Sequence, residues 1–354
     1  MKTQFSLIAI ALTMTLLIAS SAPVPAQAAT LTVNTLIDEN DGSCSNGDCS
    51  LRDAVLLANP GDTINFSVTG VMTLTGGEIV LNKNLVIQGP GQGLLAIDGN
   101  LHTIRIFHVN SGAIVHINDL TLQNGGASPG GGVYNAGNLS LTRVTLYANF
   151  VVGDGGGVYN SSLSIFHADQ TSFIGNGANY GGGIKNENAT AFIDNSTFYG
   201  NFANTRGGGM DNGSSSTVFI TNSTFWGNRN YGVANPSSST VIHNSYIALS
   251  VNSNNCIGSF ESYSVNNLST DASCPSPSFT QVTANDIKVK RVEWVLTLLP
   301  GSVAIDTGSN YRCTTYDVFG SPRPQDGDGD DIAVCDIGSY EAPKYQIFLS
   351  ILLR

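Results

Sequence analysis

A glycine-rich string that recurs at nearly constant spacing in the middle third of the chain constrains the fold most strongly. GGGVYN occurs at Gly130–Asn135 and Gly155–Asn160, and it is followed by GGGIKN at Gly181–Asn186 and GGGMDN at Gly207–Asn212. These strings start 25, 26 and 26 residues apart, and a shortened copy, YGVAN, follows at Tyr231–Asn235. Such a period is typical of folds in which each repeat packs mainly against its two neighbours.

A second string of six residues recurs in step with the first. Its copies, INDLTL, LTRVTL, ADQTSF, IDNSTF, ITNSTF and IHNSYI, end at Leu122, Leu146, Phe173, Phe198, Phe225 and Ile247. Apolar residues also stand five positions before each end and, apart from Thr240, seven positions before it, which is the alternation of a half-buried strand. Two polar residues then interrupt the alternation. Each copy therefore predicts a strand, a bend and a strand, and the glycine-rich string supplies a third strand.

About 25 residues thus form three short strands and three turns, which is one coil of a parallel β-helix. We predict an all-β fold, a single-stranded right-handed parallel β-helix (a solenoid) with a short N-terminal capping helix. Coils about 4.8 Å apart would pile Phe173, Phe198 and Phe225 over one another in the interior. A β-propeller blade needs about 40 residues, and a leucine-rich repeat needs a Leu/Asn spacing that this sequence lacks.

The second position of each bend indicates a left-handed backbone. It holds Asp119, Arg143, Gln170, Asn195, Asn222 and Asn244. Asparagine tolerates this conformation better than most residues. We expect the stacked amides of Asn195, Asn222 and Asn244 to form a hydrogen-bonded ladder along the axis.

Residues 1–28 have the layout of a secretory signal peptide. Lys2 precedes an apolar run from Phe5 to Ile18, and the small-residue triplet Ala26-Gln27-Ala28 follows. The alternative, an uncleaved membrane anchor, is weaker because a spanning helix needs roughly 20 apolar residues. We expect a secreted, extracellular or bacterial cell-surface protein with no transmembrane helix in the mature chain.

The rest of the chain divides into segments that differ in how regular the sequence repeat is. We expect 29–62 to cover the N-terminal end of the solenoid, 63–262 to form the coils, 263–343 to form a C-terminal unit, and 344–354 to be an apolar tail. Within the first segment, Ser50 and Asp53 fit a helix capping box, and Pro60 marks the end of that helix.

The composition indicates which partners the chain can bind and whether its cysteines are oxidised. The formal net charge is -11 and only 12% of residues are charged, which argues against nucleic acid as a partner. Six cysteines in an exported chain favour disulfides. Their sequence-local grouping favours Cys44–Cys49, Cys256–Cys274 and Cys313–Cys335 among the 15 possible connectivities. A zinc site would need tighter spacing.

Motifs near both ends carry a family resemblance. The string Cys49-Ser50-Leu51-Arg52-Asp53-Ala54 resembles the signature of the CSLREA N-terminal domain family, with Asp53 where glutamate is typical. Leu299-Pro300-Gly301-Ser302, Arg323-Pro324 and the string Asp336–Glu341 resemble the choice-of-anchor Q domain. The resemblance implies a bacterial surface or secreted β-helix protein, a class whose biochemical role is generally not established. The tail 344–354 is either a sorting signal or a last strand.

One pair of carboxylates is a candidate for catalysis. Asp169 and Asp194 hold the first bend position on adjacent coils, and strand spacing puts them roughly 5 Å apart. Such a pair can hydrolyse glycosides or bind a cation, whereas the alternative is two solvated turn residues. Pectin lyases and polygalacturonases build their sugar clefts from long loops, for which a period of about 25 residues leaves little room. We expect the glycine-lined flank to reflect close packing or tight turns.

An acidic run near the C-terminus resembles the start of a calcium loop. Asp326, Asp328 and Asp330 offer oxygens at alternate positions, but the twelfth position, where an EF-hand has glutamate, is Ile337. Calcium is thus the one cofactor that the sequence suggests, and a solvated acidic loop is the alternative. A separate group is expected to lock the C-terminal unit rather than to catalyse: Asp306, Arg323, Asp336 and Glu341.

The sequence favours a non-catalytic surface or matrix protein whose rigid face contacts glycans or other cell-surface components. Aromatic residues near the glycine-rich strings are candidates for that face: Tyr134, Tyr159, Tyr180, Phe202 and Tyr231. The alternative function is a carbohydrate-active enzyme, a polysaccharide lyase or glycoside hydrolase of the pectin-lyase-like class. That enzyme would need Asp169 and Asp194 in an open groove.

Overall fold

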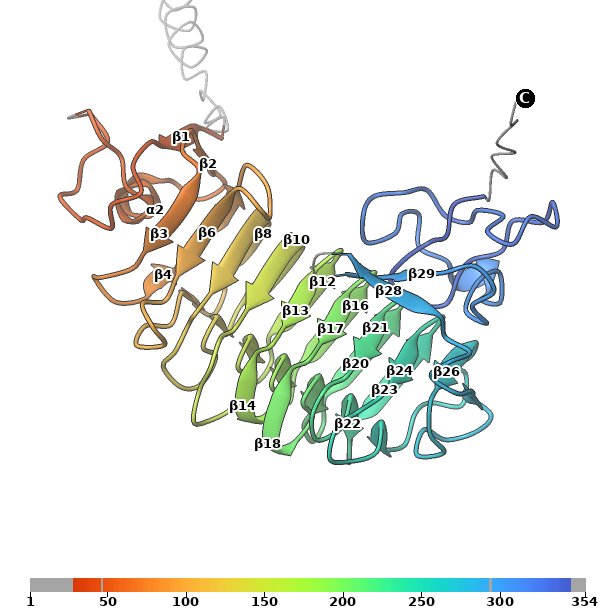
Figure 1. Cartoon of the computed structure of the whole chain (residues 1–354). Coiled ribbons are helices and arrows are strands. Elements are labelled where there is room, and N and C mark those ends of the chain that lie inside the picture. The colour runs from red at the N-terminus through yellow and green to blue at the C-terminus, as the bar shows by residue number, and fades with distance from the viewer. Residues whose placement is uncertain (1–27, 46, 293–294, 345–354) are drawn as a thin grey trace, which may run out of the picture.

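The computed structural model describes residues 28–45, 47–292 and 295–344, and these wind into a parallel β-helix of stacked coils (Figure 1). The predicted signal peptide, except Ala28, and the predicted tail, except Lys344, lie outside the described residues. Within the described ranges, no helix combines the length and the apolar character that crossing a bilayer requires.

Each coil passes through three stacks of strands, here called stacks one, two and three. Stack one holds β1 (Thr30–Val33), β2 (Thr63–Phe66), β5 (Leu85–Gln88), the first halves of β8 (Ile114–Gln123) and β10 (Asn138–Tyr147), β12 (Ile165–Asp169), β16 (Thr190–Asp194), β20 (Thr217–Thr221) and β23 (Ser239–His243). Stack two holds β3 (Gly70–Thr73), β6 (Leu95–Asp98), the second halves of β8 and β10, β13 (Ser172–Ile174), β17 (Thr197–Tyr199), β21 (Thr224–Trp226), β24 (Tyr246–Ala248), β26 (Asn267–Ser269) and β27 (Phe279–Gln281). Stack three holds β4 (Ile79–Leu81), β7 (Phe107–Val109), β9 (Val133–Asn135), β11 (Val158–Asn160), β15 (Ile184–Asn186), β19 (Met210–Asn212), β22 (Val233–Asn235) and β25 (Cys256–Gly258).

The register between coils follows the repeat, and it confirms the predicted solenoid. Phe173 pairs with Phe198, and Phe198 pairs with Phe225. Their rings stack with centroid separations of 4.5 and 4.3 Å, and all three side chains are fully buried. Interior packing therefore comes from like residues lying over like residues. Parallel pairing extends past 63–262 in both directions, since β1 pairs with β2 and β26 pairs with β27.

The bends have the predicted conformation, but the predicted amide ladder at the bends is wrong. All six bend residues have φ between 45° and 55°. Asn195 donates to Asp169 Oδ1, Asn222 donates to the Asp336 carbonyl, and Asn244 donates to the Ser309 carbonyl. Bend side chains lie outside the coils, and at Asn222 and Asn244 the C-terminal unit supplies the acceptors.

Amide ladders do form at two other positions, both buried. One runs through the last residue of the stack-three strands: Asn135, Asn160, Asn186, Asn212 and Asn235. The other follows stack two: Asn149, Asn176, Asn201 and Asn228. The signal was in the sequence, because the first set closes the glycine-rich strings and the second lies three residues after Leu146, Phe173, Phe198 and Phe225.

The glycine triplets reflect backbone geometry and close packing, as predicted. The first glycine of a triplet has a left-handed backbone, with φ of 66° at Gly181. At the third, Gly183, an added Cβ would lie 2.4 Å from the carbonyl oxygen of Gly209 on the next coil. Side chains at these positions would force the coils apart.

A helix, α2 (Leu51–Leu57), packs against the N-terminal end of the coils (Figure 1). The Ser50 hydroxyl accepts a hydrogen bond from the Asp53 amide and donates one to the Asp53 carboxylate, which explains where the helix begins. Leu51, Ala54 and Val55 are buried, so the apolar stripe faces the coils. The short capping helix is therefore present.

The C-terminal unit folds back along the solenoid and packs on the outer side of stack two at β17 and β21. It contains the antiparallel hairpin of β28 (Val289–Val292) and β29 (Val295–Leu298) and the short helix η1 (Asn310–Arg312). Ser339 hydrogen-bonds to Thr197 and Thr224 on stack two, and Gln170 donates to the Asp317 carbonyl. The three predicted disulfides are all present: Cys44–Cys49, Cys256–Cys274 and Cys313–Cys335.

A cluster of charged residues stabilises the interior of the C-terminal unit. Arg323 and Glu341 are both buried and form a 3.1 Å ion pair. Asp336 accepts hydrogen bonds from the amides of Asp306 and Ala342. Burial and the nearby Glu341 raise the pKa of Asp336 to about 8. The arrangement fits the structural role expected for these residues.

The Asn201→Ala substitution tests the amide ladders. Asn201 donates to Asn228 and to the Phe173 carbonyl, and it accepts from the backbone and side-chain amides of Asn176. We expect its loss to lower the free energy of unfolding by about 1–3 kcal/mol, because buried partners lose their hydrogen bonds. Denaturant unfolding measures this, with the exposed Asn204→Ala as control. Equal stability of the two variants would contradict a stabilising role of the ladder.

Candidate functional site

The outer face of stack one carries a short column of aromatic rings. His167, Phe192 and Phe219 occupy equivalent positions on β12, β16 and β20 and are partly exposed. Their ring centroids are 4.5 Å and 5.2 Å apart, and the planes lie within 9° of parallel. The sequence signal was present but missed: each ring immediately precedes a copy of the six-residue string.

Asp169 and Asp194 lie beside this column, at the carboxyl ends of β12 and β16, and they are directly paired in register. The Asn195 amide donates to Asp169 Oδ1 at 2.9 Å, and Thr314 of the C-terminal unit donates to Asn195 Oδ1 at 2.5 Å. The bend therefore fixes one carboxylate and connects it to the C-terminal unit.

The C-terminal unit turns this face into a groove. A hollow of about 410 Å³ opens between the two carboxylates and residues 314–316, and it is lined by Asp169, Asp194, Asn195, Thr314, Thr315 and Tyr316. The short coil period leaves little room for long loops within the coils. The wall comes instead from a segment more than 100 residues further along the chain, which a count of residues per coil does not reveal.

Burial changes the acidity of the Asp194 carboxyl. Burial raises its pKa to about 6; a hydrogen bond with Thr221 opposes this rise, and the charge of Asp169 adds to it. Asp194 can therefore hold a proton in mildly acidic solution. A carboxyl that holds a proton can donate to an oxygen of a bound ligand or act as a general acid.

A second hollow, here called the ring pocket, lies at the far end of the aromatic column. It encloses about 280 Å³ and is lined by Phe192, Asp194, Phe219, Ile220, Thr221, Val241, His243, Tyr263 and Arg312. Asp194 lines both hollows, so they meet at this residue. Arg312 and Thr314 extend the wall that the C-terminal unit provides.

Four of the aromatic residues expected near the glycine strings fall on stack three and on a separate sheet. Tyr134 and Tyr159 stack on stack three with centroids 5.6 Å apart, and Arg105 covers the Tyr134 ring. Tyr180 and Phe202 belong instead to a separate two-stranded sheet formed by β14 (Gly177–Tyr180) and β18 (Phe202–Arg206).

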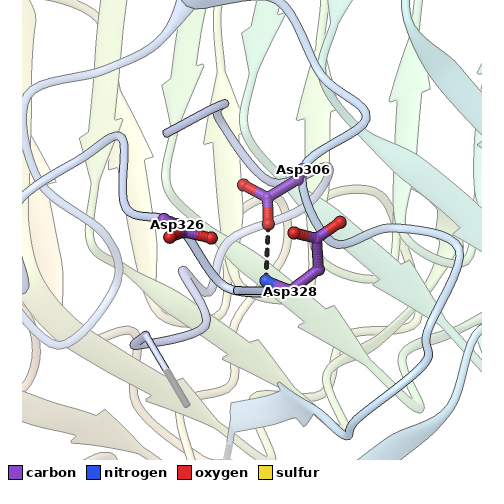
Figure 2. Close-up of side chains that lie close together, drawn as sticks. All are labelled: Asp306, Asp326 and Asp328. Carbon is purple, nitrogen blue, oxygen red and sulfur yellow. Dashed lines mark hydrogen bonds between the residues drawn. The ribbon is translucent and has the colours of Figure 1, made fainter. Parts of the chain in front are cut away.

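The acidic run at the C-terminus brings three carboxylates together, although not the expected three. Oxygens of Asp306, Asp326 and Asp328 lie within 4.8 Å of one another (Figure 2), whereas Asp330 lies outside this group. Asp330 instead accepts a hydrogen bond from the Ile332 amide within its own loop. Asp306 accepts one from the Asp328 amide (Figure 2). Asp326 also forms an ion pair with Lys344 at 2.7 Å.

Comparisons with known proteins define the class of fold. The chain is similar to the crystal structure of pectate lyase Pel9A, with a TM-score of 0.50 and 15% identity over 89% of this chain and 96% of that one. The protein therefore has a pectate-lyase-like right-handed parallel β-helix. No protein-family model matches the chain, and curated proteins give no match either. The resemblances of its terminal motifs to the CSLREA and choice-of-anchor Q families stay predictions.

Calcium at the acidic run is a prediction that the donor set permits, since calcium takes oxygen ligands. We expect calcium chloride to raise the melting temperature of the full chain only at about millimolar concentration, because three carboxylates supply few of the six to eight oxygens that calcium takes. Asp306→Asn should remove this response, and the exposed Asp330→Asn should keep it. Identical responses of both variants would contradict binding at this cluster.

Proposed function

We propose that this protein is secreted or displayed on a bacterial cell surface, where it contacts glycans or other surface components without catalysing a reaction. The single observation that carries the proposal is the column of His167, Phe192 and Phe219 beside a polar groove. Aromatic side chains next to hydrogen-bonding groups suit the amphipathic surface of sugars. The three disulfides and the expected signal peptide support an extracellular location. The family resemblance of the terminal motifs supports the cell surface.

Rigidity supports a role in surface contact. The coils hold the rings at fixed spacings along the axis, so little conformational entropy is lost when a partner binds. Several weak contacts along such a face combine into stronger binding to a repetitive polymer. Polysaccharides are repetitive polymers and can make such repeated contacts.

The proposal is tested by measuring binding of the full chain to an immobilised panel of neutral and acidic polysaccharides. We expect binding that Phe192→Ala weakens about fivefold, equivalent to ~1 kcal/mol. Tyr134→Ala is the matched control, because it removes an outward-facing stacked ring from stack three. Binding that is absent from the whole panel, or that Tyr134→Ala weakens instead, would refute the assignment to this face.

A carbohydrate-active enzyme is the alternative, because Asp169 and Asp194 do lie together in a hollow. Equivalent side chains on neighbouring strands lie about 4.8 Å apart, close to the roughly 5 Å between the carboxyls of retaining glycosidases. The solved structure with a similar fold is titled a pectate lyase. A protonated Asp194 would serve as the acid and Asp169 as the base or nucleophile.

An activity screen separates the two functions. On acidic polysaccharides we expect the wild-type chain to release neither reducing ends nor unsaturated uronates. Activity that Asp194→Asn abolishes and Asp154→Asn retains would establish the enzyme instead. Such activity should fall as the pH rises through about 6, because Asp194 loses its proton there.

A further inference from the structure

The ring pocket has a buried hydrogen-bond donor without a partner. His243 is 5% exposed, and its Nδ1 accepts a hydrogen bond from the Val265 amide at 3.3 Å. Burial and the nearby Arg312 lower the pKa of His243, so the ring is neutral at pH 7. Its single proton therefore sits on Nε2, and this atom is buried with no hydrogen-bond partner. A buried donor left unpaired is unfavourable, which points to an acceptor that arrives from outside.

The aromatic column ends at this pocket. Phe219 stacks on Phe192 on one side, while its register partner on the next coil is Val241. Valine is smaller than a ring, so part of the second face of Phe219 borders the pocket. Tyr263, which is 54% exposed, also lines it. These three side chains form an apolar floor against which one flat ring can lie.

The polar end of the pocket favours an anionic group. Arg312 is exposed, and its guanidinium lies 5.0 Å from the centre of the Tyr311 ring. A planar guanidinium suits paired hydrogen bonds to a carboxylate or a similar oxyanion, and the His243 Nε2–H adds a neutral donor. Asp194, on the remaining side, can exchange hydrogen bonds with hydroxyl groups.

We propose that the ring pocket binds one sugar ring that carries an anionic substituent. The ring lies on Phe219, Val241 and Tyr263, the anionic group meets Arg312 and His243, and a hydroxyl meets Asp194. The volume of about 280 Å³ is below that of pockets for drug-sized ligands, so it admits one ring rather than an oligomer. This inference rests on the proposed glycan contact and adds the chemical class of the sugar.

The test uses the full chain and four probes: methyl glucuronide, glucose 6-sulfate, methyl glucoside and benzoate. Titration calorimetry should show both anionic sugars binding at least fivefold more tightly than methyl glucoside and benzoate. Arg312→Gln should reduce the affinity for the anionic sugars at least fivefold and change that for methyl glucoside less than twofold. Arg291→Gln is the control, because Arg291 is exposed and lies over Tyr199, away from the pocket.

Each outcome decides the inference. Equal affinity for charged and neutral sugars, tighter binding of benzoate, or no effect of Arg312→Gln would overturn it. If polysaccharide binding still depends on Phe192 in that case, the proposed surface contact survives and only the anionic ring site fails. If no polysaccharide binds and no probe binds, both fail together.

Discussion

The structure depends on parallel hydrogen bonding between successive coils with constant register. Once β16 pairs with β12, and β20 with β16, every side chain lies over its equivalent one coil away. This superposition fills the interior with stacked phenylalanines and satisfies buried amides through asparagine ladders. A shift of one residue would place Phe198 outside and Phe192 inside, so both the core and the functional face depend on the same register.

The same superposition limits what a uniform solenoid can do on its outer surface. Rings stacked along the axis cover one another, so flat faces open only where a column ends. In this protein the column ends beside Val241, where the next coil lacks a ring. Departures from the repeat, rather than the repeat itself, therefore create the places where a ligand can lie.

The C-terminal unit adds what the coils lack. It packs on β17 and β21 of stack two, accepts hydrogen bonds from the bend amides of Asn222 and Asn244, and leaves the aromatic column on stack one partly exposed. Its segment from Arg312 to Tyr316 forms one wall of both hollows. The Cys313–Cys335 disulfide links that segment to Cys335, whose sulfur accepts a hydrogen bond from Asn222. A scaffold with short turns thus gains a groove without long loops within the coils.

The sequence by itself determined the coil, because periodic apolar residues record which side of a strand is buried. Phe173, Phe198 and Phe225, the left-handed bends, the helix cap at Ser50 and the disulfide pairs could all be predicted, since each depends on local chemistry or on the repeat. Tertiary structure alone decided that the amides of Asn195, Asn222 and Asn244 donate to other partners rather than to one another. It also decided that Asp306 replaces Asp330 in the acidic cluster, and that Arg312 lines the same hollow as His243. These contacts join segments outside the repeat to segments within it, and no periodicity encodes how a non-repeating segment folds back.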